Sequence, residues 1–443
     1  MSLASLMLET LFTRIFSVTL WSHFAFMGVS VALLGLTTGA LAVYLIPWLG
    51  RSQHIHERLT QTALLFSGVI PISILALLWI PVKQTEGLGG AMALVFQFLV
   101  LTLPFFFTGV NVTLVLTRYG GKFRKLYAAD LAGAALGCIL FIGAVQVLNP
   151  VQALFGVICL GFIAATAYAF PERRQLMQSI PGLLFSLIVL LSDIAFKWIR
   201  PEKIFNSTDL SEIAPYSLTQ VHDPSYRLVD LLMAFTLGIL VLFVIIPYIH
   251  PKRRANKTDL GYIGYFVLVG IGFMLIEIAQ LQFLTEFLQD PNYGVSVVLC
   301  TLLLATGAGS YLSRNITRKS GFARWALLLA VLIATEMVSA EFLPGMANSP
   351  FTTRMVLAIL ILIPMGVVMG MAIPLGMHFA NGSRPQMTPW YWSLNGSASV
   401  FASVLAISLF LHYGVQFPYW IGVLCYGLAA GTFSLISRTS TPI

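Results

Sequence analysis

Long apolar stretches follow one another along almost the entire chain, and they restrict its fold more than any other feature. An α-helix needs about 20 apolar residues to cross a bilayer. Fourteen segments reach or approach this length, at residues 3–21, 24–47, 61–82, 90–117, 127–148, 150–170, 179–198, 228–249, 260–285, 293–313, 323–343, 352–379, 390–412 and 416–436. Backbone groups that face lipid must be satisfied within the segment, which favours helices. The sequence therefore predicts an all-α, polytopic membrane protein with about fourteen transmembrane helices.

The scarcity of charge excludes the water-soluble classes of protein. Only 9% of the residues are charged and 58% are hydrophobic, whereas a soluble domain has roughly a quarter of charged residues. Such a chain cannot cover its surface with polar side chains. A soluble enzyme, a nucleic-acid-binding protein and a disordered chain are excluded, and the expected partner is the lipid bilayer.

The basic residues favour one side of the predicted membrane. With fourteen alternating spans, 18 of the 25 Lys and Arg residues lie on the side of the N-terminus, six lie on the other side, and Arg14 lies within the first span. Cytoplasmic loops carry the excess of Lys and Arg in membrane proteins. Both termini are therefore expected in the cytoplasm, and the one sizeable polar segment, residues 199–227, is expected to face outward.

The chain contains an internal repeat. Motifs in the first part recur about 266 to 268 residues later in the second: Glu9 as Glu277, Gly28–Val31 as Gly294–Val297, and Thr38–Ala40 as Thr306–Ala308. A second match pairs Pro104 and Asp130 with Pro364 and Asn395. We expect two parallel six-helix membrane repeats, residues 1–170 and 259–443, with 171–258 as an inserted helix pair carrying the loop 199–227. Parallel six-helix repeats are the major-facilitator arrangement.

Several of these motifs resemble the membrane part of polytopic bacterial spermidine-synthase-like proteins. The matching segments are Glu9–Arg14, Tyr127–Gly133, Gly272–Ile278, Tyr293–Leu299 and Asn395–Val400. The family carries a soluble aminopropyltransferase-like domain with a glycine-rich loop for decarboxylated S-adenosylmethionine. At the corresponding place, residues 199–227 contain no glycine and no strand–loop–helix unit for a nucleotide. The resemblance thus implies a bacterial inner-membrane location, but neither the enzymatic activity nor its cofactor carries over.

Ionisable residues within the predicted spans are the candidate functional groups. A charge at the centre of a membrane helix costs roughly 2.5–3.5 kcal/mol on insertion scales, so such residues are usually functional. Glu9 and Glu277 occupy equivalent depths in the two repeats and are expected near the central axis. Arg14 lies close enough to neutralise one of them across helices. The alternative is a buried polar clamp that only fixes helix packing.

Asp130 and Asn395 complete the predicted polar cluster. They are repeat equivalents near the start of a span, which suggests a shared role in hydrogen-bonding an interrupted helix. The alternative for Asp130 is an N-cap close to the membrane surface. The four cysteines and seven histidines show no metal-ligand spacing, so neither a metal nor a cofactor is expected.

Two functions fit this sequence. The first is a transporter-like protein whose central carboxylate and arginine cluster moves a small solute, with proton or ion coupling. The second is a non-catalytic structural or accessory subunit of a larger membrane complex. An intramembrane transferase is disfavoured because the chain has no cofactor loop.

Overall fold

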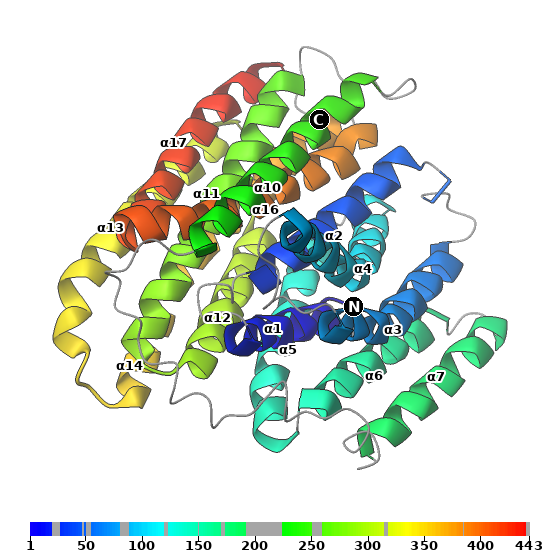
Figure 1. Ribbon diagram of the computed structural model, residues 1–443. Helices are drawn as coiled ribbons and strands as arrows, with labels where there is room; N and C mark the ends of the chain where they lie inside the picture. The colour runs from blue at the N-terminus through cyan, green and yellow to red at the C-terminus, as the bar shows by residue number, and fades with distance from the viewer. Residues whose placement is uncertain are drawn as a thin grey trace.

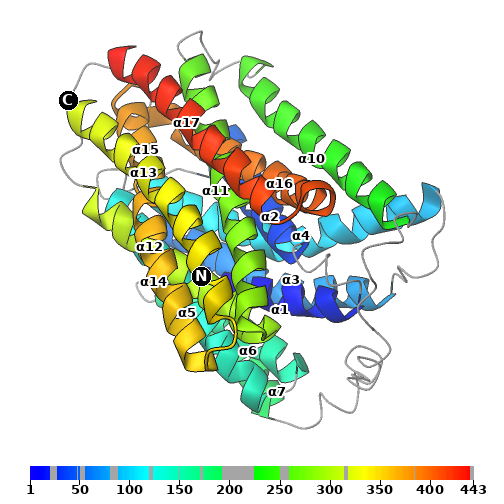
Figure 2. The same ribbon diagram turned by 90° about the vertical axis from the view of Figure 1, so that its left-hand side faces the viewer.

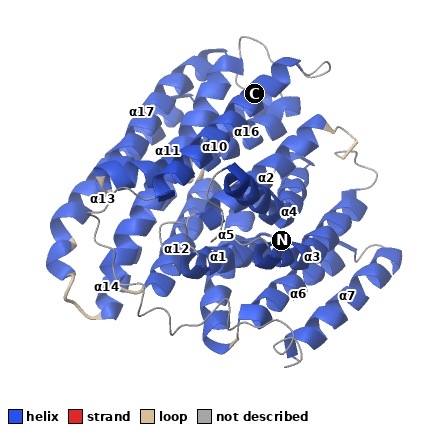
Figure 3. Ribbon diagram, viewed as in Figure 1, coloured by secondary structure: helices blue, strands red, loops and turns tan. Residues whose placement is uncertain are grey.

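A computed structural model describes most of the chain, and its described residues form helices and connecting loops without any strand (Figures 1 and 3). The described residues are 1–19, 27–46, 48–49, 55–79, 88–118, 123–148, 150–169, 173–191, 224–249, 259–313, 318–383 and 385–439. The predicted all-α class is therefore confirmed for these residues. The predicted outward loop 199–227 lies outside them, except for its last four residues, which begin a helix.

Fifteen α-helices are described within these ranges. The first seven are α1 (Ser2–Thr19), α2 (Met27–Leu45), α3 (Ile55–Trp79), α4 (Leu88–Arg118), α5 (Phe123–Val147), α6 (Pro150–Ala169) and α7 (Arg173–Leu191). The others are α10 (Pro224–Ile249), α11 (Asp259–Leu288), α12 (Pro291–Leu312), α13 (Arg318–Phe342), α14 (Phe351–Met369), α15 (Ala372–Ser383), α16 (Thr388–Tyr413) and α17 (Gln416–Thr439).

The expectation of fourteen membrane spans is wrong by two. In the described part of the chain, twelve helical segments are long and apolar enough to cross a membrane, and α14 and α15 together form one of them. The first and seventh predicted spans do not qualify. Helix α1 has 18 residues and carries both Glu9 and Arg14, and α7 offers only a short apolar stretch, Ser179–Ile188, after its basic first turn.

Two groups of helices pack in the same pattern. In the first group α1 packs on α5, α2 on α4, and α3 on α4 and α6. In the second group α11 packs on α16, α12 on α14, and α13 on α14 and α17. Figure 1 shows the first group, blue to teal, on one side of the molecule and the second, light green to red, on the other. The helices α2 and α16 join the groups along one line, and α5 and α12 join them along another (Figure 2).

Glycines allow the closest helix crossings within each group. A Cβ atom added to Gly109 of α4 would lie 2.7 Å from Cα of Leu36 on α2. In the second group, a Cβ on Gly309 of α12 would lie 2.8 Å from the carbonyl carbon of Val367 on α14. Both distances are too short for any side chain. The α2–α4 and α12–α14 crossings therefore depend on direct backbone contact, as at the small-residue interfaces of membrane helices.

The two helices of the segment 171–258 belong to different sides of the molecule. Helix α7 packs mainly on α6, whereas α10 packs on α16. The indole of Trp390 on α16 donates a hydrogen bond of 2.9 Å to the carbonyl of Phe243 on α10. Phe235 of α10 also meets Phe98 of α4 edge to face, with ring centroids 6.4 Å apart. Helix α10 therefore contacts both groups, mainly α16 of the second group and also α4 of the first. Figure 1 shows it beside α16.

Candidate central carboxylate site

Each of the two helix groups contains a buried carboxylate, Glu9 in the first and Glu277 in the second. Glu9 is the eighth residue of α1 and is 9% exposed, and Glu277 lies on α11 and is 8% exposed. The two side chains are close enough to interact electrostatically. Like charges at this separation repel in a medium of low dielectric constant. The pair is therefore stabilised when it shares a proton or when a cation lies beside it.

Three further polar side chains lie within electrostatic range of Glu277. Tyr127 and Cys138 on α5 and Tyr426 on α17 all interact electrostatically with it. Tyr426 is fully buried, and its hydroxyl has no hydrogen-bond partner within the described chain. A buried hydroxyl without a partner costs free energy, so its place beside a carboxylate indicates a group that is satisfied only when something else is bound.

The sequence interpretation missed Tyr426, although a signal for it exists. Gly156–Gly161 on α6 and Gly422–Gly427 on α17 share the pattern Gly-Val-x-Cys-x-Gly. The residue before the last glycine is Leu160 in the first segment and Tyr426 in the second. A polar residue at a position that is apolar in the matching segment marks a group retained for a reason other than packing.

Asp130 and Asn395 make the same kind of contact in the two groups. Each is the eighth residue of its helix, α5 and α16 respectively. Asp130 accepts a hydrogen bond from the hydroxyl of Ser2 on α1, and the amide of Asn395 donates one of 2.9 Å to the carbonyl of Phe266 on α11. Both therefore tie the helix that bears a central carboxylate to its neighbour. The alternative that Asp130 is an N-cap is wrong, because the residue lies in the third turn of its helix.

Arg14 lies on α1, five residues beyond Glu9, and is half-buried. Five residues correspond to about 500° of helical rotation, so the two side chains leave α1 from different faces. A same-helix pair is therefore disfavoured, and the neutralisation of one carboxylate by Arg14 across helices stays a prediction.

An aromatic cluster closes the boundary between the groups next to this site. The rings of Phe123 and Tyr127 on α5 stack with centroids 5.8 Å apart. Trp392 on α16 meets Tyr127 edge to face at 5.4 Å and Phe123 at 6.1 Å. Tyr127 also lies within electrostatic range of Glu277. These three rings pack together where the first two turns of α5 meet α16.

The described residues contain no group of three or more His, Cys, Asp or Glu side chains arranged to hold a metal ion. The four cysteines, Cys138, Cys159, Cys300 and Cys425, are not joined in disulfides. Nothing in the described part of the site therefore resembles a transition-metal centre.

Comparison with known proteins relates the chain to membrane transporters by fold. No protein-family model and no curated protein sequence matches it. A mutant of the peptide transporter POT superimposes with a TM-score of 0.56 at 12% identity, over 99% of this chain and 94% of that chain. Its complex with sulfate superimposes with a TM-score of 0.58 at 13% identity, over 100% of this chain and 93% of that chain. Its complex with alafosfalin superimposes with a TM-score of 0.54 at 14% identity, over 99% of this chain and 92% of that chain. The chain thus has a polytopic helical fold similar to that of this peptide transporter.

Proposed function

We propose that the protein moves a small solute across the membrane and that Glu9 and Glu277 line the path of the solute or its coupling ion. The observation that carries this proposal is the pair of buried, interacting carboxylates at the centre of a transporter-like fold. Two carboxylates in a low-dielectric interior can exchange a proton or a cation at small cost, because either one relieves their repulsion. Substrate and proton or ion sites of this fold class lie near the midplane between the halves.

The two halves would be parallel repeats, residues 1–170 and 259–443, with 171–258 inserted between them. The matching packing of α1–α6 and α11–α17 supports this division. The shared pattern in Gly156–Gly161 and Gly422–Gly427, at an offset of 266 residues, also supports it. In this arrangement Asp130 and Asn395 are equivalent positioning residues that hold α1 and α11 against their neighbours.

The inferred membrane is the inner membrane of a bacterium, with both termini in the cytoplasm. Twelve spans are an even number, so both termini would lie on the same side of the membrane. The resemblance to the membrane part of spermidine-synthase-like proteins supports the bacterial location. We further infer that the protein has no aminopropyltransferase activity, because residues 199–227 carry no glycine-rich loop for such a cofactor.

A flux measurement tests the proposal. The purified protein is reconstituted into liposomes, and uptake of radiolabelled dipeptides, amino acids and organic anions is measured with and without a proton gradient. Peptides lead the panel because the structures of similar fold include a peptide transporter. Glu277→Gln keeps the size of the side chain but removes its charge, and it should abolish gradient-dependent uptake. Glu286→Gln, an exposed position on the same helix, is the matched control and should transport normally.

A second candidate is a non-catalytic subunit of a larger membrane complex. It is supported by the outer face of α7, where Leu184, Phe185 and Ile188 are exposed and the helix packs mainly on α6 alone. Such a face accepts either lipid or another membrane helix. Native mass spectrometry after gentle extraction separates the candidates, since a stoichiometric additional subunit favours the complex and a lone chain favours the transporter.

A further inference from the structure

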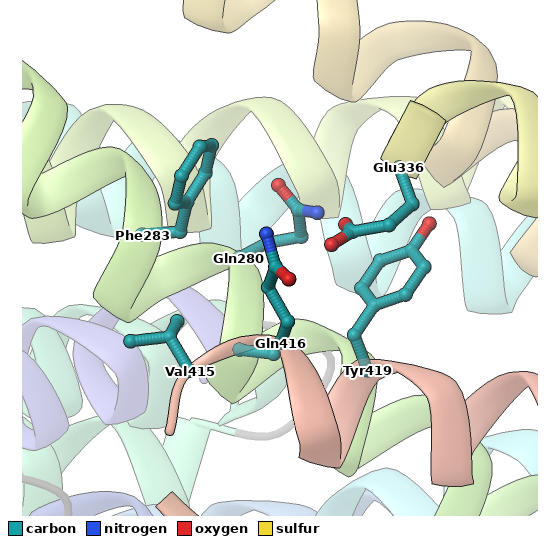
Figure 4. A pocket seen from close by; sticks show the side chains of 7 residues that line it. Gln280, Phe283, Glu336, Val415, Gln416 and Tyr419 are labelled. Atoms are coloured by element: carbon teal, nitrogen blue, oxygen red, sulfur yellow. The ribbon is translucent and has the colours of Figure 1, made fainter. Parts of the chain in front are cut away.

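A second polar site lies away from the central carboxylates, within the second group of helices. A small pocket is formed by α11, α13 and the beginning of α17, and it is lined by Ala279, Gln280, Phe283, Glu336, Val415, Gln416 and Tyr419. Figure 4 shows the side chains of Gln280, Gln416 and Glu336 pointing toward one another. Glu336 is 7% exposed and Gln280 is 1% exposed, whereas Gln416 is exposed and forms the mouth.

No Lys, Arg or His side chain lines the pocket. The buried side-chain oxygen of Gln280 has no hydrogen-bond partner in the described chain. Burial is the one effect that the described surroundings exert on the carboxyl of Glu336, and no charged side chain among them acts on it. A buried carboxylate without a counter-charge is strongly disfavoured. The pocket thus holds one negative charge and one unsatisfied acceptor, both of which a cation would satisfy.

Tyr419 does not relieve this deficit. Its hydroxyl donates a hydrogen bond of 2.8 Å to the carbonyl of Leu332 on α13 and lies 3.8 Å from the sulfur of Met365. The phenolic proton is therefore directed toward Leu332 rather than toward Glu336. The hydroxyl oxygen keeps a lone pair, which makes it a third oxygen donor at the edge of the pocket.

The size and chemistry of the pocket select a class of ligand. The space accommodates about one water-sized species, which is too small for an organic solute. Its polar lining consists of the carboxylate of Glu336, the amides of Gln280 and Gln416 and the hydroxyl of Tyr419, with a single formal negative charge. Oxygen donors of this kind suit hard cations rather than the metals that prefer nitrogen or sulfur. One negative charge balances one positive charge, whereas Ca²⁺ takes six to eight oxygen ligands, usually including several carboxylates.

We propose that the pocket formed by Gln280, Glu336, Gln416 and Tyr419 binds a monovalent cation about the size of water, namely Na⁺, K⁺ or NH₄⁺. Glu336 supplies the charge, and Gln416 lies at the exposed entrance. Figure 4 draws the amide nitrogen of Gln280 on the side of Glu336, so its oxygen becomes a buried ligand when the amide turns over as the ion binds. The site is separate from Glu9 and Glu277. Its role as a coupling-ion site rests on the proposed transport, but the binding itself does not.

Tracer binding to the purified full-length protein tests this site. Sodium-22 and rubidium-86, which follows K⁺, are titrated by scintillation proximity in detergent, with Na⁺, K⁺, NH₄⁺ and N-methylglucamine as competitors. We expect saturable binding of about one ion per chain for one pocket of this size. One of the three small cations should displace the tracer, whereas N-methylglucamine should not because it exceeds the pocket. An absence of saturable binding and of competition by any of the small cations would overturn the proposal.

Matched variants locate the ion. Glu336→Gln should weaken binding by about tenfold or more, because it removes a charged ligand. Glu341→Gln, an exposed carboxylate on the same helix, should bind as the unaltered protein does. Gln280→Leu, which removes the unsatisfied oxygen at similar volume, should weaken binding by about threefold to tenfold.

These variants also keep the two proposals apart. Thermal unfolding in N-methylglucamine verifies that Glu336→Gln folds, and Gln416→Ala at the exposed mouth gives a second readout that leaves the buried residues intact. Unchanged affinity in both Glu336→Gln and Gln280→Leu would place the ion elsewhere and refute the assignment. Loss of binding in Glu277→Gln would refute it too, because the ion would then occupy the central site. Failure of transport with intact binding contradicts only the proposed function.

Discussion

The two groups of helices match in packing but differ in the polarity of the residues at matching positions. In the second group, Gln280, Glu336 and Tyr419 line a polar pocket. Counted along matching helices, the corresponding residues of the first group are Phe12, Ser73 and Ala153. Phe12 is fully buried and meets Phe105 edge to face at 5.9 Å. Ser73 is also buried and bonds to the carbonyl of Val100 at 3.1 Å. At these positions the first group is closely packed and the hydroxyl of Ser73 has its hydrogen-bond partner. The second group instead has a pocket in which the oxygen of Gln280 has no partner.

The same asymmetry appears beside the central carboxylates. Glu277 has the unpartnered hydroxyl of Tyr426 within electrostatic range, whereas the matching residue in the first group is Leu160. Packing constrains both groups in the same way, because each must bury similar helices against one another. The polar residues that break the match are those that packing does not require. We therefore expect substitutions at Glu277 and Tyr426 in the second group to affect ligand binding more than those at the matching positions of the first group.

The largest expected effect tests this division directly at the two carboxylates. In the reconstituted assay, Glu277→Gln should lower uptake by about a hundredfold or more, equivalent to roughly 2.7 kcal/mol, and Glu9→Gln by only about tenfold. The difference is expected because Glu277 has Tyr127 and Tyr426 around it. Equal losses in the two variants would show that the carboxylates act as a symmetric pair.

Substitution of the glycine at the α2–α4 crossing and at the α12–α14 crossing should lower stability by a similar amount, because the packing of the two groups matches there. Gly109→Ala and Gly309→Ala each force a methyl group against the backbone of the facing helix, and overpacking of this kind costs about 1–3 kcal/mol. Thermal unfolding in detergent measures the loss. Gly143→Ala, where a Cβ meets no atom within 4 Å, is the control and should leave the midpoint unchanged. A large loss in only one crossing would contradict the matched packing.

The helices and their order follow from the sequence with little ambiguity, since the bilayer sets the length of each apolar run. The predicted spans 90–117 and 390–412 differ from α4 and α16 by no more than two residues at either end. The two errors in span number arose where charge interrupts or shortens the run, at α1 and α7. Length alone overstates the number of spans when residues such as Glu9 and Arg14 lie within them.

From the sequence, site residues could be predicted only where the internal repeat pairs two equivalent positions. Glu9 and Glu277 were paired by their offset, and in the structure they interact, although their role stays a prediction. The pocket at Glu336 was not accessible in this way. Its residues come from three helices separated by more than 50 positions, and no periodicity relates Gln280 to Glu336 or Tyr419. Tertiary packing alone brings them together.

A smaller loss of stability is expected when Asp130 or Asn395 is replaced, since these residues form hydrogen bonds to α1 and α11. Asn395→Leu removes the hydrogen bond to the carbonyl of Phe266, and Asp130→Leu removes the acceptor of Ser2. Each loss should cost about 0.5–1.5 kcal/mol of stability. Asp130→Asn retains an acceptor oxygen and should cost less than Asp130→Leu. Chemical denaturation in mixed micelles compares the three variants, and a larger cost for Asp130→Asn would mean that the charge itself matters there.

The smallest change in stability should come from Tyr426→Phe, although the same substitution should lower uptake. The hydroxyl is buried without a hydrogen-bond partner, so its removal spares the desolvation penalty and should change the free energy of unfolding by no more than about 1 kcal/mol, in the stabilising direction. Uptake should fall all the same, because the hydroxyl next to Glu277 would be lost to the solute or ion. Leu160→Tyr places the same hydroxyl in the matching position of the first group and should not restore uptake in Tyr426→Phe. If uptake stays normal in Tyr426→Phe, the second group owes its chemistry to Glu277 alone, and the hydroxyl is a packing residue like its counterpart Leu160.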